Sequence, residues 1–188
     1  MMHRKLLTIG VLAVFWVLWI VPAGSHPHVF VVQRLEAVFD DKGLAGIRVR
    51  WKFDDMFANM IAEDHDRNHN GQLEPSEVRS IRENAFDHIA EFNYFVFVKI
   101  DGQAFQVKYT TDFTALLDDR RLVYEFFVPC HVSATRNVKK IKVATYDPSY
   151  FTAIFFAKNS PLSLTCLLYT SDAADDWYTG GSTVVAGG

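Results

Sequence analysis

The chain has 188 residues, of which 49% are hydrophobic, and it carries 19 basic and 22 acidic side chains for a formal net charge of −3. This balance argues against nucleic acid as a partner, because a nucleic-acid-binding domain needs a basic face. Setting aside the two end segments described below leaves about 140 residues, a common size for a single domain with its own core.

Residues 1–25 are typical of a secretory signal peptide. A basic start at 3–5 precedes an apolar run at 6–21, and small residues then lead to a predicted cut before His26. The run is short for a membrane span, and an uncleaved anchor is the alternative. Both interpretations place the body of the protein outside the cytoplasm, and we expect it in the periplasm.

The predicted mature N-terminus is His26-Pro27-His28. A free amine and two imidazoles can hold a transition metal such as Zn²⁺, Ni²⁺, Co²⁺ or Cu²⁺. His26 and His28 are therefore candidate ligands. The alternative is that His28 simply begins a strand and that His26 frays at the chain end.

Alternating hydrophobic and polar residues predict strands at 29–39, 47–53, 94–100, 104–109, 112–117, 121–128 and 141–146. In the second of these, Ile47, Val49, Trp51 and Phe53 share one face. In the first, the pattern groups Val29 and Val31 with Arg34, Glu36 and Val38. Turn sequences such as Asp101-Gly102 separate consecutive strands. Sequential hairpins without β-α-β spacing predict an antiparallel sheet, interrupted between about 54 and 93 by a helix–loop–helix; the fold class is α+β.

The segment Asp66–Glu77 matches the twelve-residue EF-hand calcium loop. Gly71 stands at the sixth position, where the chain turns sharply. The oxygen ligands expected for Ca²⁺ are Asp66, Asn68, Asn70, the carbonyl of Gln72, Glu74 and Glu77. Calcium is a hard cation that prefers oxygen, so we expect the histidines nearby, His65 and His69, to be solvated.

Hydrophobic residues flank the loop at helical spacing: Phe57, Met60 and Ile61 before it, and Val78, Ile81, Ala85, Ile89 and Phe92 after it. Asp54 and Asp55 are expected to cap the entering helix. The alternative is a polar turn that binds no metal. The chain has a single loop of this kind, so we expect modest affinity, as in extracellular calcium modules.

The end of the chain, about 163–188, departs from the rest in composition and resembles translated sequencing-adapter sequence. We therefore expect the domain to span 26–162 and the tail to be non-native. Cys166 lies in that tail, which leaves Cys130 without an expected disulfide partner.

Four features together resemble a bacterial family of periplasmic proteins of unknown function, DUF1007. They are the leader, then His26-Pro27-His28-Val29-Phe30 at its end, then Trp51-Lys52-Phe53-Asp54 with Met56-Phe57, and Tyr146-Asp147-Pro148-Ser149-Tyr150. The resemblance covers His26 to about Phe156. Members are often described as periplasmic components of an ABC-type transport system. This implies a role in divalent metal traffic beside an inner-membrane metal permease.

The expected function is thus an exported calcium-binding accessory of a Ni/Co/Zn-type transport system. His26 and His28 would hold the transported metal, joined in space by His88 or His131. One alternative is a copper oxidase with an N-terminal histidine chelate. Another is a docking domain that calcium only stabilises. The sequence lacks the nucleophile, zinc-protease and phosphate-loop motifs of common enzymes, so we expect no enzyme.

Overall fold

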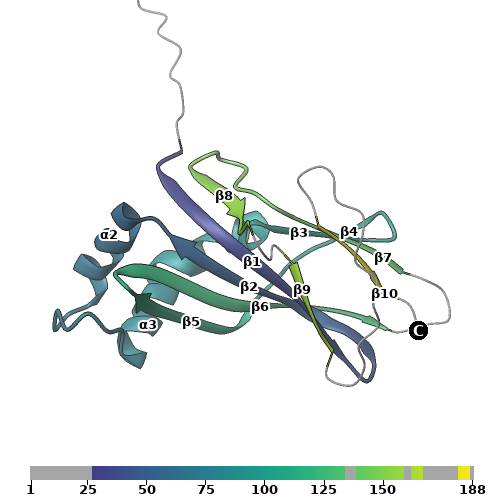
Figure 1. Cartoon of the computed structure of the whole chain (residues 1–188), viewed down its shortest axis with the longest axis horizontal. Helices are drawn as coiled ribbons and strands as arrows, with labels where there is room; N and C mark the ends of the chain where they lie inside the picture. Colours follow the sequence, from purple (N-terminus) through teal and green to yellow (C-terminus); the bar gives the residue numbers. More distant parts are fainter. Residues whose placement is uncertain (1–26, 134–138, 159–161, 167–181, 187–188) are drawn as a thin grey trace, which may run out of the picture.

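The computed structural model describes residues 27–133, 139–158, 162–166 and 182–186. The strands of the large sheet are β1 (Val29–Asp40), β2 (Gly43–Phe53), β5 (Thr111–Asp118), β6 (Arg121–Ser133), β8 (Thr152–Phe156) and β9 (Leu162–Cys166). Their order is β5-β6-β2-β1-β8, and β9 also pairs with β1. The small sheet has the order β10-β7-β3-β4, formed by β10 (Ser182–Ala186), β7 (Lys139–Thr145), β3 (Val96–Ile100) and β4 (Gln103–Phe105). Figure 1 shows the helices α2 (Asp55–His65) and α3 (Pro75–Ile81) at one end of the large sheet and the small sheet toward the other.

The predicted α+β class with mostly antiparallel sheets is confirmed. The β1-β2, β2-β6 and β5-β6 pairs are antiparallel, as are all three pairs of the small sheet. The sequence did not predict β8 and β9, which both run parallel to β1. They reach β1 after the chain has left β7, so a crossover brings them in and no hairpin signal precedes them.

Strand β1 buries a different set of residues from the one that the sequence pattern suggested. Val29, Val31, Gln33, Leu35 and Ala37 face inward, so strict alternation continues through the polar Gln33. The Gln33 side chain is fully buried, and its amide donates to the Thr145 hydroxyl on β7. The inward faces of the two sheets therefore meet at this point. The predicted grouping was wrong because the hydrogen bond that Gln33 donates to Thr145 on β7 lets a polar residue occupy a core position.

Two hairpins have the turns that the sequence predicted. Asp101 and Gly102 have φ values of 50° and 85° between β3 and β4, and Asp119 and Arg120 have 50° and 62° between β5 and β6. Positive φ at both central residues is the twist that suits a two-residue antiparallel hairpin.

Aromatic rings fill the core beneath the large sheet. The ring centroids of Trp51 and Phe126 lie 4.9 Å apart, and those of Phe53 and Tyr124 lie 4.8 Å apart. Both pairs meet edge to face, the arrangement that the ring quadrupole favours. Phe86 packs against the same group, 4.9 Å from Phe126.

The segment after the loop differs from the single long helix that the sequence predicted. Helix α3 (Pro75–Ile81) is followed by a π-helical turn, η1 (Arg82–Phe86), and by the 3-10 segment η2 (Asp87–Phe95). A π turn adds a residue to the helical repeat and shifts the buried face. Phe86 is therefore 2% exposed, while the predicted core position Ala85 is only partly buried.

Several strand boundaries also differ. Asn93, Tyr94 and Phe95 have left-handed φ values, so β3 begins at Val96, two residues later than predicted. Strand β4 ends at Phe105, and β6 continues to Ser133. Segment 141–146 is not the last strand, because β8, β9 and β10 follow it.

The membrane-related and tail predictions fall largely outside the described residues. The leader, 1–25, is not described, and none of the helices in the described ranges has the length and apolar character needed to cross a bilayer. The tail contributes the backbone of β9 and β10, while its side chains are not described.

Candidate functional site

Asp54 fixes the entrance to the candidate loop. It is the N-cap of helix α2 (Asp55–His65), with its Oδ1 accepting from the Phe57 N–H at 3.0 Å. Its other oxygen accepts from the Phe30 N–H at 2.6 Å, and its own N–H donates to the Phe30 carbonyl at 3.0 Å. One carboxylate thus caps the helix and ties it to β1. Asp55 lies in the first turn and pairs with Arg121 at 2.7 Å.

The first half of the loop turns its side-chain oxygens inward. Asp66 is 4% exposed, and its oxygens accept from the N–H groups of Asn70 at 3.2 Å and Gly71 at 2.9 Å. The Asn68 Oδ1 also accepts from the Asn70 N–H at 3.0 Å, and the Asn70 Oδ1 accepts from the Gln72 N–H at 2.7 Å. The oxygens at loop positions 1, 3 and 5 are therefore held on the concave side of the turn.

Glu77 closes the loop by joining its two ends. It is 5% exposed; its Oε1 accepts from the Arg67 N–H at 2.9 Å and its Oε2 from the Glu74 N–H at 3.0 Å. The Glu74 Oε1 accepts from the side-chain amides of Asn68 at 3.1 Å and Asn70 at 2.7 Å. Its Oε2 is buried, and none of the described residues donates a hydrogen bond to it. An orphaned carboxylate oxygen of this kind is short of a positive partner.

The neighbours of Glu74 stabilise its ionised form. Contact with the Glu77 carboxyl group, followed by the Asn68 and Asn70 amides, lowers the pKa of Glu74 to about 2. Within the described part of the chain, neither Asp66 nor Glu77 forms an ion pair with a basic side chain. Burying a carboxylate without a counter-charge is costly, so the loop has an excess of negative charge that a cation would offset.

Gly71 and His69 have the backbone conformations that the turn requires, with φ values of 74° and 54°. An added Cβ at Gly71 would meet nothing within 4 Å, so the need for glycine here is purely conformational. His69 is exposed, in agreement with the sequence prediction.

His65 does not match the prediction of a solvated loop residue. It belongs to the last turn of α2, is half-buried, and its Nδ1 lies 3.0 Å from the Ser80 hydroxyl on α3. The two residues are fifteen positions apart, and no local sequence pattern indicates that they meet. This contact links the helices on either side of the loop.

The six predicted calcium ligands occupy one continuous turn, although Gln72 is exposed and its predicted contribution is a backbone carbonyl. Among the described residues, no three histidine, cysteine or acidic side chains gather as a metal cluster on their own. The predicted ligands also include the side-chain amide oxygens of two asparagines and a backbone carbonyl oxygen. A hard cation binds such oxygens in addition to carboxylates.

The predicted transition-metal ligands are placed only in part. His26 lies outside the described residues. His28 stands just before β1, and its ring centroid is 5.1 Å from that of Phe151. His88 and His131 are exposed, and the structure does not assemble them with His28 into a cluster of three. Cys130 is buried and forms no disulfide among the described side chains, and burial raises its pKa to about 11.

Comparison with known proteins places the chain in a family. The chain belongs to the family described as "Protein of unknown function (DUF1007)", whose family model matches residues 11–173. The match extends past residue 162, where the sequence suggested that the native domain ends. The adapter interpretation of the tail stays a prediction.

Two relatives carry no functional description. The chain is 31% identical over 101 residues to an "Uncharacterized 15.5 kDa protein in trpE 3'region" of Spirochaeta aurantia, covering 54% of this chain and 71% of the relative. It is 22% identical over 146 residues to an "Uncharacterized protein" of Haemophilus influenzae, covering 76% of this chain and 68% of that protein. No solved structure matches the chain.

Replacing Asp54 by alanine tests how the loop is anchored. The change removes the cap of α2 and leaves the Phe30 N–H without its acceptor. We expect the free energy of unfolding to fall by about 1–2 kcal/mol, measured by urea denaturation. The matched control is Asp55→Ala, which removes only an exposed ion pair and should cost less than about 1 kcal/mol. Equal losses for the two variants would contradict the anchoring role.

Proposed function

We propose that the protein is an exported calcium-binding protein and that Asp66–Glu77 is its calcium site. The observation that carries this proposal is the burial of Asp66 and Glu77, 4% and 5% exposed, without a basic partner among the described residues. Carboxylates in this position gain most from a cation held between them.

The chemistry of the donors suits calcium. Carboxylate oxygens have several lone pairs, so Asp66 and Glu77 can accept from backbone N–H groups and still face an ion. The asparagine oxygens and the Gln72 carbonyl add neutral oxygen donors, and calcium takes six to eight oxygens in a flexible shell. Zinc and copper sites favour nitrogen and sulfur, and the one imidazole in the loop, His69, is exposed at a position outside the proposed ligand set.

The proposed role of the ion is to stabilise the folded state. Helix α3 leads directly into η1, which carries Phe86 into the core against Phe113 and Phe126, at centroid distances of 4.4 and 4.9 Å. Mutual repulsion of the loop carboxylates loosens this connection, and a bound cation removes the repulsion. Calcium binding is therefore coupled to the packing of the large sheet.

Thermal unfolding with and without calcium tests the site. Calcium at ten times its Kd should stabilise the folded chain by about 1.4 kcal/mol. For a domain of this size, that raises Tm by roughly 3–5 °C. Glu77→Gln should abolish the rise, because a bidentate carboxylate is lost. Glu83→Gln, an exposed change outside the loop, should keep it.

Magnesium should substitute poorly in the same measurement, since it demands a smaller octahedral shell and holds its water tightly. A wild-type chain that melts at the same temperature in millimolar calcium and in chelator would show that the loop is a polar turn without a metal.

A pair of glycine variants separates calcium binding from backbone strain. Gly71 and Gly102 both have positive φ, 74° and 85°, and an added Cβ meets nothing within 4 Å at either site. Alanine should therefore cost a similar amount at each, about 1 kcal/mol. Only Gly71→Ala should also weaken calcium affinity, by several-fold in calorimetric titration. Equal calcium affinities in the two variants would place the binding site elsewhere.

We further propose that the protein acts in the periplasm as an accessory of a divalent transition-metal transporter, with an inner-membrane metal permease as its partner. This rests on the motifs shared with periplasmic proteins of the DUF1007 family and on the leader-like segment 1–25. His26 and His28 are the proposed ligands, of which His28 is exposed and accessible at the start of β1.

The N-terminal amine makes this second proposal testable. A chain that begins at His26 should bind Ni²⁺, Cu²⁺ or Zn²⁺ more tightly than a chain with one extra residue before it, because the extension moves the amine out of chelating reach. Titration of both forms, with His28→Ala as a further variant, measures the difference. Equal affinity in the extended and unextended forms would argue against the chelate.

A further inference from the structure

The strand β10 lies at the edge of the small sheet, outside the part of the chain that the family model matches. It pairs antiparallel with β7, so that Thr183 is in register with Lys142 and Val185 with Lys140. Figure 1 shows β10 running alongside β7. The family match ends at residue 173, whereas β7 and its other neighbour, β3, lie within it. The family pattern therefore specifies β7 and does not specify the strand that covers its edge.

The backbone groups that β7 offers to β10 are those of alternate residues. The Lys140 N–H donates to Asp101 Oδ1 at 2.9 Å, and the Lys140 carbonyl accepts from the Asp101 N–H at 2.8 Å, so Lys140 points its backbone toward the β3–β4 turn. Successive residues of a strand direct these groups to opposite sides, and Ile141 and Val143 therefore direct theirs toward β10. Without β10 they would form an open ladder, which pairs readily with an extended segment.

The outer face beside this edge is basic. Lys140 and Lys142 are exposed on β7, and Lys142 is in register with the exposed Lys99 on β3. Like charges directly opposite each other destabilise a sheet. We call these three residues the small-sheet lysine cluster, and none of them forms an ion pair with a described residue. The cluster thus lacks the counter-charge that would offset its repulsion.

The described side chains supply little negative charge to this face. None of the strands β3, β4, β7 and β10 contains an acidic residue. Asp101, in the β3–β4 turn, is paired with Lys139 at 3.0 Å. Asp147 lies beyond the end of β7, where it is buried and accepts hydrogen bonds from Ser149 and Thr152. Even with Asp147 counted, the lysines are in excess.

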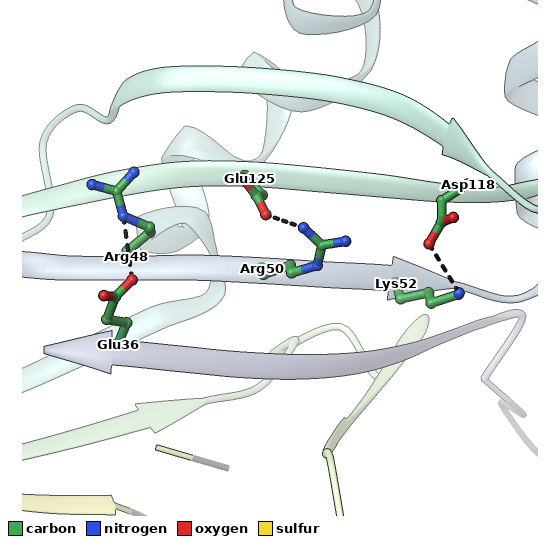
Figure 2. Close-up of polar contacts among 6 residues, drawn as sticks. All are labelled: Glu36, Arg48, Arg50, Lys52, Asp118 and Glu125. Atoms are coloured by element: carbon green, nitrogen blue, oxygen red, sulfur yellow. Dashed lines mark hydrogen bonds and ion pairs between the residues drawn. The ribbon is translucent and has the colours of Figure 1, made fainter. Parts of the chain in front are cut away.

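The outer face of the large sheet shows what the small sheet lacks. Three basic side chains of β2 have acidic partners in the same sheet (Figure 2), in the ion pairs Arg48–Glu36, Arg50–Glu125 and Lys52–Asp118. The small sheet carries a similar number of exposed basic side chains without such partners. An added strand with acidic side chains would give it the same kind of pairing.

Two other occupants fit the edge of β7 less well. In an antiparallel pair of β7 strands centred on Ile141, Lys140 of each copy would lie opposite Lys142 of the other, and lysines on an edge strand oppose such self-pairing. An anionic polymer without a peptide backbone would meet the lysines and leave the ladder groups of β7 unpaired. An extended peptide with acidic side chains satisfies both the ladder and the charge.

We propose that the edge of β7 is a strand-acceptor site for an extended segment of a partner protein with acidic residues at alternate positions. In this chain the uncharged β10 occupies the site, and Thr183 and Val185 stand where the partner has Asp or Glu. A strand tethered to the same chain competes with the partner through its high effective concentration. The inference is independent of calcium and of the proposed metal transport.

Binding of a labelled peptide to the full chain tests the site. The probe contains Ser-Glu-Val-Glu-Ala, which is the β10 sequence with glutamate at the two positions opposite lysine. Val184 is in register with Ile141, so Val184→Pro removes a ladder hydrogen bond and releases β10. The probe should bind this variant roughly ten-fold more tightly than wild type, because the tethered competitor is gone. The matched control, Val185→Pro, affects an N–H that points away from β7 and should bind the probe like wild type.

Two further probes separate strand addition from simple charge attraction. Replacing the central valine of the probe by proline keeps its charge and removes a ladder donor, and exchanging both glutamates for lysine keeps the ladder and reverses the charge. Neither should bind Val184→Pro measurably. Adding Lys140→Gln and Lys142→Gln to Val184→Pro should weaken binding of the glutamate probe several-fold, and high salt should reduce this difference.

A measurement that leaves β10 in place covers the case in which Val184→Pro fails to fold. Thr183→Glu/Val185→Glu in the full chain should raise Tm by a few degrees, and Thr183→Lys/Val185→Lys should lower it, since opposite charges across a ladder stabilise it and like charges destabilise it. The difference between the two variants should shrink in high salt.

Three results would overturn the proposal. Equal binding of the glutamate probe and its proline form would assign the lysines to an anionic polymer. Dimerisation of Val184→Pro, with no binding of the probe, would assign the edge to a second copy of the chain. A folded Val184→Pro that neither dimerises nor binds the probe would show that β7 accepts no added strand, as would equal Tm values for the glutamate and lysine variants of β10.

Discussion

The structure depends most on the burial of one face of the β1–β2–β6 unit. Val31, Val49 and Phe126 belong to three adjoining strands and are each almost fully buried. At roughly 25 cal/mol for each Å² of apolar surface removed from water, such a face is the main source of stability in a domain of this size. Every other element is placed relative to it: the small sheet covers part of it, and Phe86 and its neighbours cover the rest.

The candidate calcium loop is attached to this unit at both ends. Asp54 joins the start of α2 to β1, and α3 leads through η1 to Phe86 in the core. The proposed ion site and the packing of the sheet therefore depend on the same helices. A ligand that binds only the folded chain stabilises it by RT ln(1 + [L]/Kd), whatever the number of its contacts.

The inner and outer faces of the large sheet differ in chemistry. The inner face is apolar except at Gln33, whose amide reaches Thr145. The outer face carries exposed ion pairs, which contribute little stability but keep that face hydrated. At one end of this surface Phe30, Val32 and Phe155 are exposed.

The sequence by itself determined the features that arise from neighbouring residues. Alternation defined the inner face of β2, Asp101-Gly102 predicted the hairpin between β3 and β4, and the spacing of Asp66–Glu77 predicted a turn with its oxygens on one side. The tertiary structure alone decided the rest: the parallel β8 on β1, the buried Gln33, the π turn that buries Phe86, and the contact between His65 and Ser80. These depend on partners far away in the chain, and the free energy of such contacts leaves no periodic signal in the local sequence.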